Sequence, residues 1–174
     1  MVWLLGLWLA GGWATAAESA AGVSEYQVKA AFIYNFTKFT DWPASSFPSA
    51  GAPIVIGIVG EDPFGKIMDD IVRGEVVRGR RLVVKRYRAD EDLRGCHVLF
   101  ISRSERERLD QLLGQLKGRP VLTVGDTSGF AEQGGTVNLL VVDKTVKLVI
   151  NQAAAARAGL QISAKLLKLA RLVE

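Results

Sequence analysis

The sequence predicts an α/β fold: a mostly parallel sheet with helices on both faces and a C-terminal antiparallel hairpin, Rossmann-like but without a dinucleotide fingerprint. Between residues 54 and 124, short apolar runs rich in β-branched residues alternate with short helical patterns, which is typical of strands covered on both faces. Two later β runs, 136–142 and 145–150, are separated only by Asp143-Lys144, which is a hairpin signal. Hydrophobic residues make up 49% and charged residues 23% of the 174 positions, as in globular chains.

The remaining elements follow from caps and periodicity. Ser24 can cap a first helix over 25–39, which Trp42-Pro43 ends, and residues 44–53 form a loop. The predicted strands are 54–59, 81–87, 97–102 and 120–124, and the predicted helices between them are 66–72 and 106–116, with a short turn or helix at 90–94.

After the hairpin, the pattern predicts two more helices. Asn151 can cap a helix over 152–158 that Gly159 stops, and Ser163 can begin a last helix over 164–173. Leu166, Leu167, Ala170 and Val173 give this last helix an apolar face.

The N-terminus predicts export. Residues 2–9 are an unbroken apolar run with no Lys or Arg before it, and Ala14-Thr15-Ala16 has the small-x-small pattern of a signal-peptide cleavage site. The run is shorter than the roughly 20 residues that cross a bilayer. We therefore expect a signal peptide at 1–17 and a single α/β domain at 18–174.

One loop almost matches a phosphate-binding P-loop. Gly60–Ile67 follows a strand and opens a helix, with the spacing GxxxxGK. However, Ile67 lacks the hydroxyl that would hold Mg²⁺, and Glu61 and Asp62 place negative charge where phosphates would sit. We interpret this loop as a strand-to-helix turn.

Residues for catalysis or metal binding are scarce. The chain has one histidine, His97, and one cysteine, Cys96, and adjacent strand residues point to opposite faces of a sheet. They therefore form neither a nucleophile–base pair nor a zinc site, and a lone cysteine excludes an intrachain disulfide. We predict no catalytic residue, no metal site, no cofactor and no enzymatic activity.

A basic stretch and an aromatic turn are the candidate contact residues. Arginines and lysines dominate residues 73–88, and a net charge of +4 together with export argues against nucleic acid as the partner. Such a stretch is either a solvated strand flank or a surface for an acidic protein. Trp42 precedes Pro43, where the chain turns away from the first predicted helix, so we expect its ring to be partly exposed. Exposed aromatic residues often anchor interfaces. The predicted partner-contact residues are Trp42, Phe47, Arg78, Arg80, Arg81 and Arg86.

Several ordered motifs resemble the YfiR/HmsC-like family. They are Ala30–Phe39 with Trp42-Pro43, Val59-Gly60 with Asp62–Gly65, Val121–Asp126 with Gly129-Phe130, and the closing Ile150–Ala154 with Ala158–Leu167. Together they cover nearly all of residues 18–174.

The resemblance implies a periplasmic α/β protein, often a homodimer, that binds the periplasmic part of a membrane-bound diguanylate cyclase and represses it. Repression lowers cyclic di-GMP and limits biofilm formation. Some members carry paired cysteines whose disulfides respond to redox state. This chain has only Cys96, so the resemblance does not imply intramolecular redox control here. The alternative is a periplasmic small-ligand receptor, in which loops 60–65, 102–105 and 125–130 at the strand ends hold a small anion.

Overall fold

The computed structural model describes residues 24–174, so the predicted signal peptide lies outside the described residues. An eight-stranded sheet, in the order β10-β8-β7-β6-β5-β2-β4-β3, forms the centre of the molecule, and β1 and β9 form a separate two-stranded ribbon. The strands of the two sheets together are β1 (Thr40–Asp41), β2 (Ile54–Val59), β3 (Val76–Val77), β4 (Arg80–Tyr87), β5 (Val98–Ile101), β6 (Leu122–Gly125), β7 (Val137–Val142), β8 (Thr145–Asn151), β9 (Gln161–Ile162) and β10 (Ala170–Val173).

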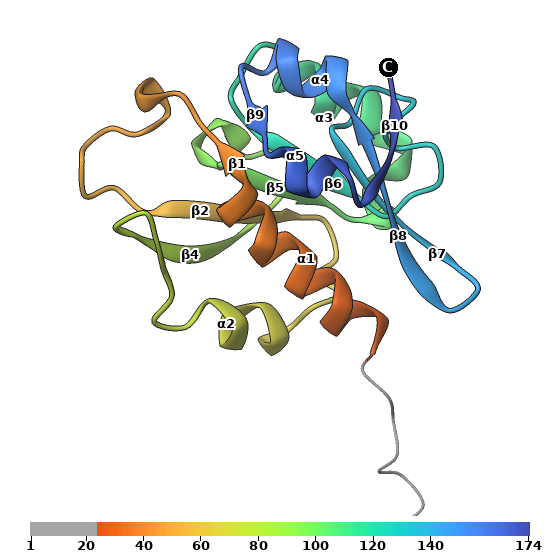
Figure 1. The fold of residues 1–174 in the computed structure, drawn as a ribbon, viewed down its shortest axis with the longest axis horizontal. Helices are drawn as coiled ribbons and strands as arrows, with labels where there is room; N and C mark the ends of the chain where they lie inside the picture. The colour runs from red at the N-terminus through yellow and green to blue at the C-terminus, as the bar shows by residue number, and fades with distance from the viewer. Residues whose placement is uncertain (1–23) are drawn as a thin grey trace, which may run out of the picture.

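Helices lie on both faces of this sheet (Figure 1). They are α1 (Glu25–Phe39), α2 (Lys66–Val72), α3 (Leu109–Gln115), α4 (Gln152–Arg157) and α5 (Ala164–Leu167), with 3₁₀ turns η1 (Ala44–Ser46), η2 (Leu93–Gly95) and η3 (Arg103–Arg108). The predicted fold class, a mostly parallel sheet covered on both faces with a C-terminal antiparallel hairpin, is confirmed.

The central strands are apolar along their whole length because both of their faces are buried. In β2, Ile54, Ile56 and Ile58 belong to one core with residues of α1 and α2, and α1 crosses in front of the sheet in Figure 1. The alternate residue Val59 lies in a second core with Leu99 of β5 and Leu112 of α3. The twofold periodicity of a strand thus divides each apolar run between two cores.

Helix caps form as the sequence predicts. The Ser24 hydroxyl accepts a hydrogen bond from the Gln27 amide, and the Gln27 side chain accepts one from the Ser24 amide, which completes a capping box at the start of α1. The Asn151 side-chain oxygen Oδ1 accepts a hydrogen bond from the Ala154 amide at the start of α4. In the β7–β8 turn, Asp143 and Lys144 both have positive φ (49° and 60°), the conformation of a type I′ hairpin.

The last predicted helix is wrong beyond its first turn. The structure has α5 at Ala164–Leu167 only, and then β10, which pairs in parallel with β8. A helix of ten residues is marginal without tertiary packing, whereas β10 satisfies the open backbone edge of β8. Sequence analysis also missed the short strands β1, β3 and β9.

The order of the strands creates a topological switch point. β2 pairs in parallel with β4 on one side and with β5 on the other. The chain therefore adds β4 to one edge of β2 and then crosses over to add β5 to the other edge. The carboxyl ends of β2, β5 and β6 therefore lie along one edge of the sheet, where open α/β sheets place their ligands.

Two glycines enclose the ring of Phe130, and this close packing yields a prediction. A Cβ atom on Gly135 would lie 2.1 Å from Phe130 Cε1, and one on Gly125 would lie 2.3 Å from Phe130 Cδ2. Gly135→Ala should lower the free energy of unfolding by about 1–3 kcal/mol, because the buried ring has no room to move.

The control is Gly114→Ala in α3, where a Cβ meets no atom within 4 Å. Alanine there should stabilise the protein by up to about 1 kcal/mol, because it favours helix. Urea unfolding monitored by circular dichroism measures both changes. Equal effects of the two substitutions would contradict this account of the Phe130 packing.

Candidate functional site

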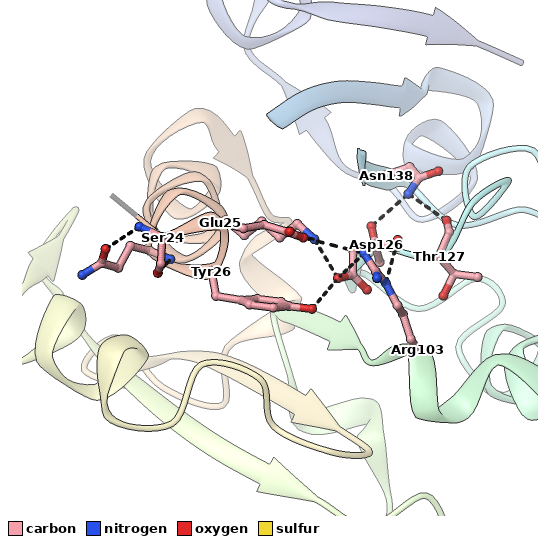
Figure 2. A network of polar contacts seen from close by, with 10 residues as sticks. Ser24, Glu25, Tyr26, Arg103, Asp126, Thr127 and Asn138 are labelled. Carbon is pink, nitrogen blue, oxygen red and sulfur yellow. Dashed lines mark hydrogen bonds and ion pairs between the residues drawn. The ribbon is translucent and has the colours of Figure 1, made fainter. Parts of the chain in front are cut away.

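A buried charge cluster lies at the carboxyl edge of the sheet, and Figure 2 shows it from close by. Asp126 directly follows β6, and its side chain is 1% exposed. The Lys29 ammonium, which is fully buried, donates to Asp126 Oδ2 at 2.7 Å and also pairs with Glu25 one helical turn earlier. A buried ion pair needs such close contacts because removing each charge from water costs several kcal/mol.

Two further side chains complete the cluster around Asp126. The Tyr26 hydroxyl donates to Asp126 Oδ2 at 3.2 Å, and the Arg103 guanidinium lies 3.3 Å from the same oxygen (Figure 2). Burial raises the pKa of Tyr26, and the nearby negative charge of Asp126 raises it further. Helix α1 thus contributes the residues that face the loop after β6.

The loop that carries Asp126 is fixed from the other side by Asn138 of β7. The Asn138 side-chain amide donates to the carbonyl oxygens of Gly125 (3.1 Å) and Thr127 (3.0 Å). Asp126 Oδ1 and Asn138 Oδ1 are buried and have no hydrogen-bond partner within residues 24–174. Sequence analysis did not single out Lys29, Asp126 or Asn138, although Asp126 lies in one of the family-like motifs.

A cavity of about 760 Å³ lies beside this cluster. Its walls include Glu25, Arg103, Arg106 and the loop 126–128, with apolar residues of β7 opposite. Two of the three loops proposed for a small ligand, 102–105 and 125–130, therefore contribute to one cavity. The third loop, 60–65, contacts η3 through the Glu61 amide, which donates to Ser104 Oγ at 2.9 Å, but does not line the cavity.

In the P-loop-like turn, the protein's own carboxylate occupies the backbone amides. Asp62 Oδ1 accepts from the amides of Phe64 (2.8 Å) and Gly65 (3.2 Å), and Asp62 Oδ2 accepts from Arg86 at 2.7 Å. Arg86 also pairs with Asp69 of α2. The turn therefore has the structural role that the sequence suggests.

The predicted contact residues lie in two places. Trp42, Phe47 and Arg80 gather around His97: the Phe47 ring stacks on the imidazole at 4.4 Å, and the Arg80 guanidinium lies 3.7 Å from the Phe47 ring centre. The Trp42 indole N–H donates to the carbonyl oxygen of His97 at 3.1 Å. Trp42 and Phe47 are half-buried, so these rings also serve as packing.

The other predicted arginines are separated from this aromatic cluster or are engaged locally. Arg78 pairs with Asp41 and donates to the Thr40 carbonyl, which ties the β3–β4 turn to β1. Arg81 is exposed near the start of β4. Arg86 lies near the other end of that strand, where it forms ion pairs with Asp62 and Asp69.

Cys96 and His97 face opposite sides, as strand geometry predicts. Cys96 is buried in the core beside α3, and burial raises the pKa of its thiol to about 11. His97 Nδ1 accepts a hydrogen bond from the Val55 amide at 3.1 Å, so its neutral form carries the proton on Nε2. Burial lowers the pKa of this histidine.

Several exposed apolar side chains, which sequence analysis did not single out, lie near the β10 edge of the sheet and on the hairpin. They are Val141, Val142, Leu169 and Leu172, which are 43–72% exposed. Val142 and Leu169 line one groove of about 520 Å³, together with Phe32 and Leu148. We call these two residues the apolar patch; Val141 is adjacent to Val142 in β7 and points to the other face of the strand.

The family match decides what kind of protein carries these features. A profile described as YfiR/HmsC-like matches residues 26–171, which is most of the chain. The chain belongs to the YfiR/HmsC-like family. The resemblance found in the sequence motifs is thereby confirmed. The match spans the charge cluster except for Glu25, and it includes the aromatic cluster around His97 and the apolar patch.

Two solved structures are similar in fold to this YfiR/HmsC-like protein. A conserved domain protein from Vibrio cholerae has a TM-score of 0.58 at 13% identity over 87% of this chain. The ABC domain in complex with L-Trp from Streptococcus pneumonia has a TM-score of 0.49 at 12% identity over 69% of the chain. The chain covers 60% and 55% of those two chains. At such low identity, the Vibrio cholerae protein supports the fold alone.

Two kinds of feature are absent from residues 24–174. No helix there is long and apolar enough to cross a membrane. No group of three or more His, Cys, Asp or Glu side chains in that range is placed to hold a metal ion.

The Lys29–Asp126 pair predicts a large effect on stability. Lys29→Met should lower the free energy of unfolding by about 3–5 kcal/mol, because it leaves the Asp126 carboxylate buried without its closest cation. Adding Asp126→Leu should recover much of this loss, because the buried charge is then gone. Denaturant unfolding measures all variants.

Arg103→Gln serves as the control for this prediction. Its side chain is 57% exposed, so its loss should cost at most about 1 kcal/mol. A Lys29→Met variant as stable as Arg103→Gln would contradict the assigned importance of the buried pair.

His97 predicts a pH dependence of stability. Because its folded pKa is lowered, the unfolded state takes up a proton at a higher pH than the folded state. The free energy of unfolding should therefore fall on acidification below the usual histidine pKa of about 6.5, by at most about 1.4 kcal/mol per pH unit.

The measurement is urea unfolding between about pH 7 and pH 5, above the range in which unfolded carboxylates titrate. His97 is the only histidine, so His97→Gln should abolish the slope. An equal slope in His97→Gln would assign the pH dependence to other groups.

Proposed function

We propose that the mature chain is a periplasmic regulatory protein, without catalytic activity of its own, that binds the periplasmic part of a membrane-bound diguanylate cyclase and holds it inactive. Repression would lower cyclic di-GMP and limit biofilm formation. The single observation that carries this proposal is the family match along residues 26–171. The apolar, cleavable-type N-terminus in the sequence supports export, and we expect the active form to be a homodimer.

Repression by binding requires a difference in affinity. The protein lowers the cyclase's activity only in so far as it binds the inactive state more tightly than the active state. A contact that is equally strong in both states would hold the two proteins together without regulating either.

Two surfaces of the chain could supply this contact. The predicted surface is the aromatic and arginine cluster, in which Arg81 is free in the solvent but Trp42 and Phe47 are partly used in packing. The second is the apolar patch of Val142 and Leu169, which line one groove. Exposed apolar patches on exported proteins commonly mark interaction sites, so the patch is the stronger candidate on physical grounds.

A periplasmic small-ligand receptor is the second candidate function. The observation that favours it is the cavity of about 760 Å³ beside Asp126, at the switch-point edge of the sheet. A thermal-shift screen of anions, amino acids and nucleotides tests this alternative. A strong shift from one compound class would favour a receptor.

The regulatory proposal predicts a cellular result and a binding result. Deleting the gene should raise cyclic di-GMP, and restoring the wild type should lower it again. The periplasmic part of the regulated cyclase should be captured by the purified protein. Unchanged cyclic di-GMP, together with no captured cyclase, would contradict the proposal.

Charge substitutions then identify the contact surface. Leu169→Glu should weaken capture by about 5- to 150-fold if the apolar patch makes the contact, because it puts a charge into a desolvated interface. Val76→Glu is the matched control, since Val76 is equally apolar and 55% exposed but lies on the opposite edge strand. Arg81→Glu should instead slow association and reduce its salt dependence if the predicted surface makes the contact.

A further inference from the structure

A second cavity, of about 460 Å³, lies where the end of α3 meets the beginnings of β6 and β7 and the end of α4. It is distinct from the cavity beside Asp126, because the two share no lining residue. Its volume is in the range of about 300–1,000 Å³ that is usual for small-molecule sites.

The charged residues around this cavity are mostly basic. Lys117, Arg119 and Arg157 line it, and Asp110 is its one acidic lining residue. The three cations come from the turn after α3 and from the last turn of α4, so the fold brings them together from segments about 40 positions apart in the sequence. None of the three forms an ion pair within residues 24–174.

Part of the buried wall of the cavity is polar but uncharged. Thr123 of β6 and Thr136 before β7 are both buried, and their hydroxyl oxygens lie 3.2 Å apart. The Thr136 amide donates to Thr123 Oγ1 at 2.9 Å. Leu113, Val121 and other apolar residues form the remaining walls, so an anion in the cavity would meet no carboxylate there except Asp110.

Helix dipoles alone do not account for this arrangement. Cations near the C-terminal ends of helices are favourable, which can explain Lys117 after α3 and Arg157 in α4 individually. Arg119 lies beyond the end of α3, in a turn closed by its own amide and the Leu116 carbonyl, where no helix end requires a cation. The three charges nevertheless share one cavity.

We propose that this cavity binds a small anion with at least two negative charges, of the phosphate or carboxylate type. Arg119 and Arg157 supply guanidinium groups, whose planar donors suit both phosphate and carboxylate oxygens, and Lys117 adds a third positive charge. The proposal goes beyond the regulatory function and does not depend on it. It also differs in location from the small-anion site expected at the carboxyl ends of the strands.

Calorimetric titration of the purified protein with pyrophosphate, and separately with citrate, tests the proposal. Wild type should bind at least one of the two, and the arm that binds distinguishes a phosphate-type from a carboxylate-type site. Replacing both guanidiniums, in Arg119→Gln/Arg157→Gln, should weaken binding by about tenfold or more, since hydrogen bonds to charged groups are the strong ones.

The matched control is Lys165→Gln/Lys168→Gln, which removes the same total charge away from the cavity. It should leave the affinity within about twofold, because distant exposed charges are largely screened. Circular dichroism verifies that each variant is folded, and Arg119→Lys/Arg157→Lys, which keeps the charge, should retain part of the affinity. Absence of binding by both anions to wild type, or an equal loss in the control pair, would overturn the proposal.

Discussion

The buried contact between Lys29 and Asp126 is the constraint on which the carboxyl edge of the sheet depends. It joins the first turns of α1 to the loop after β6, two segments that lie 97 positions apart in the sequence. With both charges almost completely removed from water, any arrangement that separates them is strongly disfavoured. Tyr26, Arg103 and the loop fixed by Asn138 take their positions around this pair.

The anchoring of α1 also explains the different character of the surfaces. Its buried side covers the central strands, while apolar side chains of β7, of β10 and of the residue before β10 remain exposed to solvent. The opposite face, beside α3 and α4, carries the basic cavity. The α/β core thus has exposed apolar side chains and a basic cavity in separate places.

Much of the fold could be predicted because its signals are local. The apolar runs, the Ser24 and Asn151 caps and the Asp143-Lys144 turn each determine their own element, and the structure has all of them. The strand β10 could not be predicted, because its residues fit helical spacing equally well and only the open edge of β8 decides between the two. The charge cluster could not be predicted for a similar reason. A lysine within a helical pattern, such as Lys29, is expected to be exposed to solvent, and only the fold brings Asp126 into contact with it.

The pairing pattern of the sheet has a consequence for how the chain reaches its native state. In the large sheet, β3–β4 and β7–β8 are antiparallel pairs joined by short turns, whereas in the centre of the sheet Ile56 pairs in parallel with Val98. Long-range parallel pairing closes large loops before it gains contacts, and chains of this kind fold slowly. A chain exported unfolded would therefore keep its apolar strands accessible for some time after crossing the membrane. Chaperones outside the cytoplasm should then affect the yield of folded protein more than its final stability.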